Sequence, residues 1–229
     1  MDFYYLLSIF CLIIAVIISV AAQLYISHNY RKYSKKSCEM DINGAETARR
    51  ILDNNGLNDI SINAISGSLT DNYNPGKRSV NLSEKIYSKN SIASVAVAAH
   101  ECGHAIQDKE GYTFLRMRKA IIPFVNLVSY AGYIAIILGI FFSFIDVVSI
   151  GIGVELVILA FQLITLPVEF NASERGLKQI QELGLLTNEE FKGGKKMLKS
   201  AALTYVAGVA STLLQILRLV LILASRHRD

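Results

Sequence analysis

Hydrophobic residues are concentrated in four long runs along the chain, and polar segments separate these runs. Each run reaches the length of about 20 apolar residues that a helix needs to cross a lipid bilayer. The runs cover residues 3–26, 120–142, 147–168 and 201–224. The pattern therefore predicts a mainly α-helical protein with four transmembrane helices.

The first run is predicted to be a retained membrane anchor. The segment SVAAQ offers small residues at which a secretory signal could be cleaved. However, the leading residues MDFYY contain an acid and no Lys or Arg, and the apolar run is longer than the core of a signal peptide. We therefore expect this run to stay in the membrane.

Between the first two runs the pattern changes to short amphipathic elements. The segment NGAETARRILDNNG predicts a helix capped by Asn43, because apolar residues recur at helical spacing before Gly56. The alternation in DISINAISG predicts a strand. A second short strand is predicted through Val80 and Leu82, and Ser83 can cap the element that follows.

The segment SIASVAVAAHECGHAIQD predicts an Ala-rich helix that begins near Ser91. This extramembrane piece is short for an independent core, so we expect it to pack against the segment after the third run. The whole chain, 1–229, is predicted to be one integrated unit. Its small α+β catalytic portion would comprise residues 38–119 and 169–199.

The distribution of positive charge predicts the orientation of the chain. Hydrophobic residues make up 52% of the chain and charged residues 18%. Most of the 23 Lys and Arg lie in segments 31–119 and 169–199, which the four runs place on one side of the membrane. That side is expected to be the cytoplasm. The basic clusters beside the runs are typical of membrane topology and lipid contact, and they indicate no nucleic-acid partner.

The segment HECGH carries the candidate chemistry. On a helix, His100 and His104 lie one turn apart on the same face, so both imidazoles can bind one metal ion. Glu101 is rotated by about 100° from His100, within reach of a water but not of the metal itself. Zinc lowers the pKa of its bound water to about 7, and Glu101 would act as the general base. Cys102 is at the wrong angle to be a ligand.

A catalytic zinc site needs a third protein ligand and one open position. The other histidines, His28 and His227, lie at the outer ends of the terminal runs, in segments that do not resemble a site. A carboxylate is therefore the better candidate. Glu169 is favoured among the acids of the second polar segment because it directly follows a span, which holds its position. The other acids there are Glu174, Glu182, Glu189 and Glu190.

Two ionisable residues interrupt the apolar runs, Glu155 in the third and Arg218 in the fourth. Each costs about 2.5 to 3.5 kcal/mol at the centre of a spanning helix, so each is expected to face protein or water. The two could form a pair. Alternatively, Glu155 is protonated and Arg218 extends to a lipid headgroup.

At these residues the chain resembles the YugP-like family of membrane-bound neutral zinc metallopeptidases over essentially its whole length. The matching segments are GSLTDNYNP, VNLSEKIY, SIASVAVAAHECGHAIQD, LPVEF and LTYVAG. The resemblance implies a zincin-like catalytic portion that uses Zn²⁺. It also implies that His100 and His104 are ligands and that Glu101 is catalytic.

The chain is more distantly similar to the HtpX-like and Ste24-like membrane proteases, whose third ligand is the Glu that opens an E-x-x-A-D pattern. Here EFNAS supplies Glu169 and Ala172, but Ser173 stands in place of the Asp. Such an Asp usually orients a metal-bound imidazole. Asn171, Ser173 or another acid could take over this role.

We expect a zinc-dependent metallopeptidase whose site faces the cytoplasmic membrane surface and whose substrates are peptides or membrane proteins near the bilayer. A substrate could lie extended beside the strand at Val80 and Leu82. Two alternatives remain open: a zinc-binding membrane chaperone or scaffold without turnover, and a metal-dependent hydrolase of lipid amides or esters. Candidates for the oxyanion stabiliser are Tyr73, Tyr87, Tyr112 and Arg218.

Overall fold

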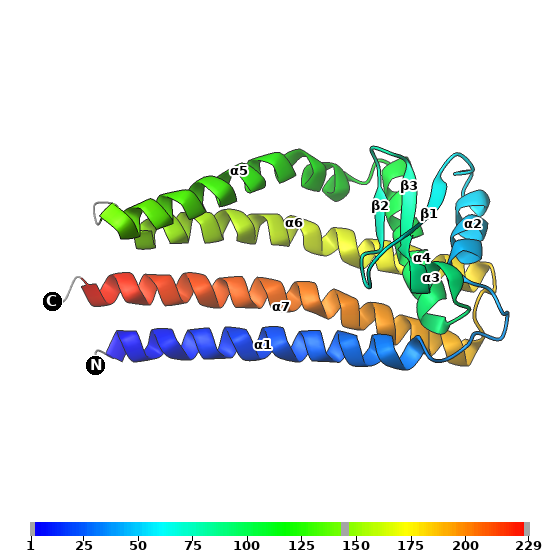
Figure 1. The fold of residues 1–229 in the computed structure, drawn as a ribbon, viewed down its shortest axis with the longest axis horizontal. Coiled ribbons are helices and arrows are strands. Elements are labelled where there is room, and N and C mark those ends of the chain that lie inside the picture. Colours follow the sequence, from blue (N-terminus) through cyan, green and yellow to red (C-terminus); the bar gives the residue numbers. More distant parts are fainter. Residues whose placement is uncertain (1–2, 143–146, 227–229) are drawn as a thin grey trace. The chain divides into compact units, whose positions relative to one another are not determined.

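The computed structural model describes residues 3–142 and 147–226, and this part of the chain is mainly helical (Figure 1). The elements are α1 (Phe3–Tyr33), α2 (Gly44–Asn54), β1 (Ser61–Ile65), β2 (Asn72–Asn74), β3 (Ser79–Ser83), α3 (Glu84–Ser88), α4 (Ile92–Lys109), α5 (Thr113–Phe142), α6 (Val147–Glu182) and α7 (Asn188–Arg226). Helices α1, α5, α6 and α7 are long and apolar enough to cross a membrane, and each contains one predicted span. The predicted fold class is confirmed.

The chain divides into two compact units. We call the first the four-helix unit, which comprises Met1–Gln23, Met117–Leu166 and Thr204–Asp229. The second is the mixed unit, which comprises Leu24–Arg116 and Pro167–Leu203 and contains the sheet. The integration of 1–229 into a single unit stays a prediction.

The helices of the four-helix unit are joined by close contacts between small residues. The hydroxyls of Ser19 on α1 and Ser211 on α7 are 2.9 Å apart, and the Ser211 hydroxyl also donates to the Ala15 carbonyl. Gly132 on α5 packs so closely on the Val154 side chain of α6 that a Cβ there would overlap with it. Such small residues let spanning helices approach one another in a bilayer, where apolar burial alone gives little attraction between helices.

The mixed unit contains a three-stranded sheet with the order β1-β3-β2. β3 pairs in parallel with β1 and antiparallel with β2, with Val80 opposite both Ile62 and Tyr73. Because β3 is paired with β1 along its whole length and with β2 at Ser79 to Asn81, a substrate peptide cannot add as a strand at Val80, and the prediction of a peptide beside this strand is wrong there. The outer strands of this sheet are β1 and β2.

Most local elements of the mixed unit agree with the sequence pattern. Asn43 caps α2 as predicted, in a reciprocal capping box with Glu46, and α4 begins after Ser91, the predicted start, where the Ser91 side chain caps the helix. β1 and β3 lie where the alternation predicted them. Ser83 precedes α3 but does not cap it, because its hydroxyl contacts the Asp71 carboxylate instead. The short strand β2 was not predicted.

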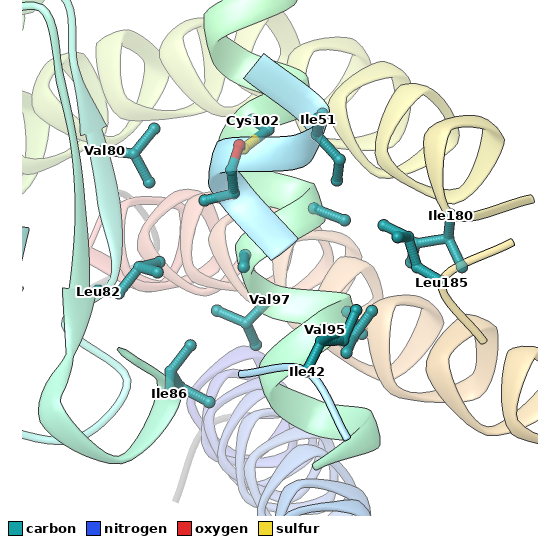
Figure 2. Close-up of a cluster of buried hydrophobic side chains, with 14 of the residues drawn as sticks. Ile42, Ile51, Val80, Leu82, Ile86, Val95, Val97, Cys102, Ile180 and Leu185 are labelled. Atoms are coloured by element: carbon teal, nitrogen blue, oxygen red, sulfur yellow. The ribbon is translucent and has the colours of Figure 1, made fainter. Parts of the chain in front are cut away.

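The core of the mixed unit surrounds α4, and Figure 2 shows side chains from α2, β3, α3 and α6 packed around this helix. Apart from His100 and its last two residues, α4 is buried, which explains its richness in Ala: small side chains let several elements approach it at once. The largest buried side chains of this core include Ile51, Leu52, Leu82, Ile86 and Ile180.

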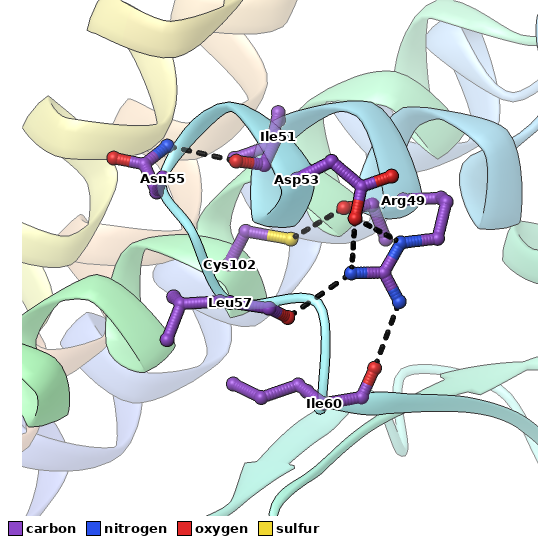
Figure 3. A network of polar contacts seen from close by, with 8 residues as sticks. Arg49, Ile51, Asp53, Asn55, Leu57, Ile60 and Cys102 are labelled. Carbon is purple, nitrogen blue, oxygen red and sulfur yellow. Dashed lines mark hydrogen bonds and ion pairs between the residues drawn. The ribbon is translucent and has the colours of Figure 1, made fainter.

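Polar contacts stabilise the turn that leads from α2 into β1 (Figure 3). The Arg49 guanidinium donates to the carbonyls of Ile60 and Leu57 at 2.9 and 3.0 Å and pairs with the Asp53 carboxylate. The Cys102 thiol lies beneath α2, where its Sγ is 3.7 Å from the Ala48 carbonyl oxygen. Cys102 is fully buried in the core, and this burial raises the pKa of its thiol.

Helices α4 and α6 touch backbone to backbone within the mixed unit. A Cβ at Gly103 would overlap with the Ala172 carbonyl, and a Cβ at Gly176 would lie 2.6 Å from the Ala99 carbonyl oxygen. These carbonyls belong to helical backbone and cannot rotate away. The small residues of α4 therefore set its distance from α6.

Substitution Gly103→Ala is expected to destabilise the protein by about 1–3 kcal/mol, because the added methyl group must push the two helices apart. Thermal unfolding of the detergent-purified protein measures this loss. Gly153→Ala is the matched control, since Gly153 lies within α6 and a Cβ there would meet no described atom within 4 Å. Equal unfolding temperatures for Gly103→Ala and the wild type would contradict the close packing.

Candidate metal centre

His100 and His104 lie on the face of α4 that meets α6. Their rings are one helical turn apart, with centroids 4.8 Å from each other and planes at 80°. Both side chains are largely buried. The sequence places them here because no Pro interrupts α4 between Ile92 and Lys109.

Glu169 reaches the same point from α6. Its Oε2 lies 3.4 Å from His100 Nε2 and 3.6 Å from His104 Nε2, and the residue is only 3% exposed. Glu169 is one turn before Ala172, the residue that touches Gly103. The close helix contact therefore brings the carboxylate to the two imidazoles. The structure thus gathers all three predicted ligands, whose ligand roles stay a prediction.

Gln107 holds His104 in the form that a metal site requires. Its side-chain Nε2 donates to the Val168 carbonyl at 2.8 Å, and this contact determines which way the amide points. The amide Oε1 then lies 3.0 Å from His104 Nδ1 and can only accept a hydrogen bond. Because Nδ1 must donate, His104 Nε2 presents its lone pair toward Glu169 when the ring is neutral.

Ser173 takes the corresponding position beside His100. Its hydroxyl oxygen is 3.0 Å from His100 Nδ1 and can accept a hydrogen bond from that nitrogen. This is the serine that stands where the more distantly similar proteases have Asp. Of the possible substitutes for that Asp, Ser173 is therefore the one that contacts an imidazole directly.

Gln107 is itself held by a polar chain that the sequence pattern did not reveal. Its Nε2 also donates to Asn171 Oδ1 at 3.0 Å, and the same oxygen accepts from Arg175 Nε at 2.7 Å. Arg175 in turn pairs with Glu110 at the end of α4, at 2.6 Å. The sequence spacing could have predicted the contact between Gln107 and His104, because Gln107 follows His104 by three residues and so lies on the same helical face.

Burial and neighbouring charges both act on the titratable groups. Burial raises the pKa of the Glu101 carboxyl, although the nearby imidazoles oppose this effect. Burial alone would lower the pKa of His104, but the Glu169 and Glu101 carboxylates outweigh it and raise that pKa. A cation is therefore favoured at this cluster of acids.

The donor set of two imidazoles and a carboxylate suits a zinc ion, and the separations of the two imidazole nitrogens from the Glu169 oxygen are those of zinc ligands. The three donor atoms lie within 4.8 Å of one another. Zinc at about 2.0–2.2 Å from tetrahedral N and O ligands places those ligand atoms about 3.3–3.6 Å apart. The two measured separations from Glu169, 3.4 and 3.6 Å, agree with this requirement. Two imidazoles and one carboxylate also leave one position for water or substrate, as catalytic zinc sites do.

The remaining sequence candidates have different environments. His28 lies on α1 and lines a separate surface depression, and His227 lies outside the described residues. Glu182 and Glu189 pair with lysines, while Glu190 accepts hydrogen bonds from backbone N–H groups.

Tyr73, one of the four candidates for the oxyanion stabiliser, has its hydroxyl engaged elsewhere. The hydroxyl donates to the Asp108 carboxylate at 2.9 Å. A donor that already serves a carboxylate is not available to an oxyanion. The roles of Tyr87, Tyr112 and Arg218 stay predictions.

Comparison with known proteins identifies the family of the chain. A family model described as "Putative neutral zinc metallopeptidase" matches residues 8–224. The chain is also 43% identical over 217 residues to the "Putative membrane protease YugP" of Bacillus subtilis (strain 168), a match that covers 95% of this chain and 96% of that protein. No solved structure matches the chain significantly.

The relative described as a membrane protease and the four apolar helices together indicate a multi-pass membrane protein. The family match extends over nearly the whole chain, and it includes HECGH and Glu169. The chain therefore belongs to the family of neutral zinc metallopeptidases that this model describes.

Proposed function

We propose that the protein is a zinc-dependent membrane metallopeptidase that hydrolyses peptide bonds. The observation that carries this proposal is the convergence of His100, His104 and Glu169 from two helices, with Glu101 next in sequence to the first histidine. The ring nitrogens that face away from Glu169 are hydrogen-bonded, which leaves the two Nε2 atoms available to a metal ion.

Glu101 is proposed to be the general base. Zinc, when bound, supplies Lewis-acid chemistry that polarises the scissile carbonyl and acidifies water. The Glu101 carboxylate accepts the proton of the attacking water and then delivers it to the departing amine. Burial raises the pKa of Glu101, which makes its carboxylate a stronger base than an exposed one.

The burial of Glu101 also favours turnover over a purely structural metal site. Among the described residues, no hydrogen bond or ion pair to its carboxylate is found, and the residue is 7% exposed. The Glu101 side chain is largely buried next to three metal-ligand candidates and has no such partner within the described part of the chain, an arrangement that a purely structural metal site does not need. A base that must exchange protons with a bound water has reason to remain unpaired.

The site is proposed to face the cytoplasm, near the membrane surface. Glu169 directly follows the predicted third span, and most of the basic residues lie in the segments on that side of the predicted spans. Substrates would then be membrane proteins or peptide segments close to the bilayer.

Replacing Glu101 by Gln and Glu169 by Ala is expected to separate catalysis from metal binding. Glu101→Gln should keep zinc and lose about 10²–10⁴-fold in cleavage rate, because it removes only the base. Glu169→Ala should lose zinc, because only two imidazoles remain. Metal analysis and cleavage of casein by the detergent-purified protein measure both effects. If Glu169→Ala binds zinc with wild-type affinity, Glu169 is not a ligand. If the wild type binds zinc but cleaves no peptide, a scaffold or a lipid hydrolase is favoured instead.

Gln107→Leu is expected to weaken zinc binding about 10–100-fold, because His104 Nδ1 loses its acceptor. Gln107→Glu keeps an acceptor oxygen for His104 but loses the donor to the Val168 carbonyl and adds a buried charge, so it should recover only part of the affinity. Competition with a chelator measures the affinity. Gln179→Leu is the matched control, since this buried glutamine on α6 accepts hydrogen bonds from Asn54 and Asn55 and, among the described residues, forms no hydrogen bond with a histidine. A similar loss in Gln107→Leu and Gln179→Leu would indicate general destabilisation.

If the mixed unit faces the cytoplasm, a cysteine introduced by Ser66→Cys is shielded from a membrane-impermeant maleimide in intact cells. It is expected to react after the cells are permeabilised. Ser66 is exposed in the mixed unit. The native cysteines Cys11, Cys38 and Cys102 are all buried and should contribute little background. Labelling of Ser66→Cys in intact cells would mean that the mixed unit lies outside the cytoplasm.

A further inference from the structure

The four-helix unit contains a cavity of about 290 Å³ between α5, α6 and α7. Its lining is mostly apolar, but three polar side chains contribute to it: Glu155 from α6, and Gln215 and Arg218 from α7. Tyr133 of α5 also lines the cavity and is 62% exposed, so this side of the cavity lies at the surface of the unit.

Among the residues that the structure describes, these three polar groups have no partner. Gln215 Oε1 is buried without a hydrogen bond. Within 3–142 and 147–226, neither Glu155 nor Arg218 takes part in an ion pair, although both line this cavity. The pair considered from the sequence is therefore not formed. An acid, an amide oxygen and a guanidinium without partners in an apolar environment point to a polar ligand.

The position of the cavity indicates where this ligand comes from. Its lining on α6 runs from Val147, the first residue of the helix, to Ile158. At a rise of 1.5 Å per residue, the cavity extends about 16 Å inward from the helix end. The ends of spanning helices lie at the level of the lipid headgroups. A headgroup can therefore enter at this end while its acyl chains remain in the bilayer.

We propose that this cavity binds the headgroup of phosphatidylethanolamine. Arg218 donates paired hydrogen bonds to the phosphate, because its planar guanidinium matches phosphate oxygens. The primary ammonium donates to Glu155 and to Gln215 Oε1. Phosphatidylcholine has no N–H to donate, and phosphatidylglycerol has no cation, so neither satisfies all three groups. This binding does not depend on zinc or on peptidase activity.

Native mass spectrometry of the detergent-purified protein tests the proposal. The wild type, incubated with phosphatidylethanolamine, phosphatidylcholine or phosphatidylglycerol, should retain phosphatidylethanolamine preferentially and unfold at a higher temperature in its presence. Glu155→Gln and Arg218→Gln should each weaken this retention about tenfold, because each removes a charge-assisted hydrogen bond. Arg218→Lys keeps the charge but loses the paired geometry, so it should retain less than the wild type.

Gln162→Leu provides the matched control. Gln162 lies on α6 in the same unit, and its Oε1 is also buried without a partner among the described residues, but it does not line the cavity. This variant should retain phosphatidylethanolamine as the wild type does. Equal retention of the three lipids, or loss of retention in Gln162→Leu, would overturn the proposal.

Two further measurements distinguish a lipid headgroup from a soluble ligand and from an internal ion pair. Soluble phosphoethanolamine should give no stabilisation, and stabilisation by this compound would reveal a site for a free ligand and reject the lipid site. Each single variant, Glu155→Arg or Arg218→Glu, is expected to lower the unfolding temperature. The double variant should not restore it to the wild-type value. Restoration of that temperature without lipid would mean that Glu155 and Arg218 interact with each other, and the lipid site would be rejected.

Discussion

The candidate site depends on one steric constraint, the backbone contact between α4 and α6. Gly103 meets the Ala172 carbonyl and Gly176 meets the Ala99 carbonyl, with no room for a side chain at either glycine. This contact places Glu169, one turn before Ala172, at 3.4 and 3.6 Å from the two imidazoles. A wider spacing would separate the carboxylate from the histidines, because the side chain of Glu169 could not follow both. The small residues within HECGH and EFNAS are thus as important to the geometry as the candidate ligands themselves.

The groups that orient the imidazoles are neutral. Gln107 and Ser173 contact the two Nδ1 atoms, where a carboxylate often serves in zinc sites. Glu169 and Glu101 already supply negative charge to this buried region, and a further carboxylate would add repulsion at high desolvation cost. The amide of Gln107 can replace it because Val168 and Asn171 determine its orientation. Contacts of Asn171 with Arg175, and of Arg175 with Glu110, then connect this network to the end of α4.

The two units use polar groups in apolar surroundings in different ways. In the mixed unit, buried polar side chains around the histidines satisfy one another through a continuous chain of hydrogen bonds. In the four-helix unit, Gln215 and the two ionisable residues line a cavity without pairing with one another. A satisfied network makes a site rigid, whereas unpaired groups in an apolar environment favour a bound ligand. The first arrangement suits metal binding and the second suits lipid binding.

The sequence by itself determined those features that depend on neighbouring residues. Helical periodicity places His100 and His104 on one face, Asn43 caps its helix, and the four apolar runs lie within four long helices. The adjacency of Glu169 to a span was sufficient to select it among several acids. Only the tertiary structure decided that Gln107 bonds to Val168, that Ser173 contacts His100, and that β3 lies in the middle of the sheet. These contacts join segments far apart in the chain, and their pairing is decided by backbone approach and side-chain packing, which local periodicity does not encode.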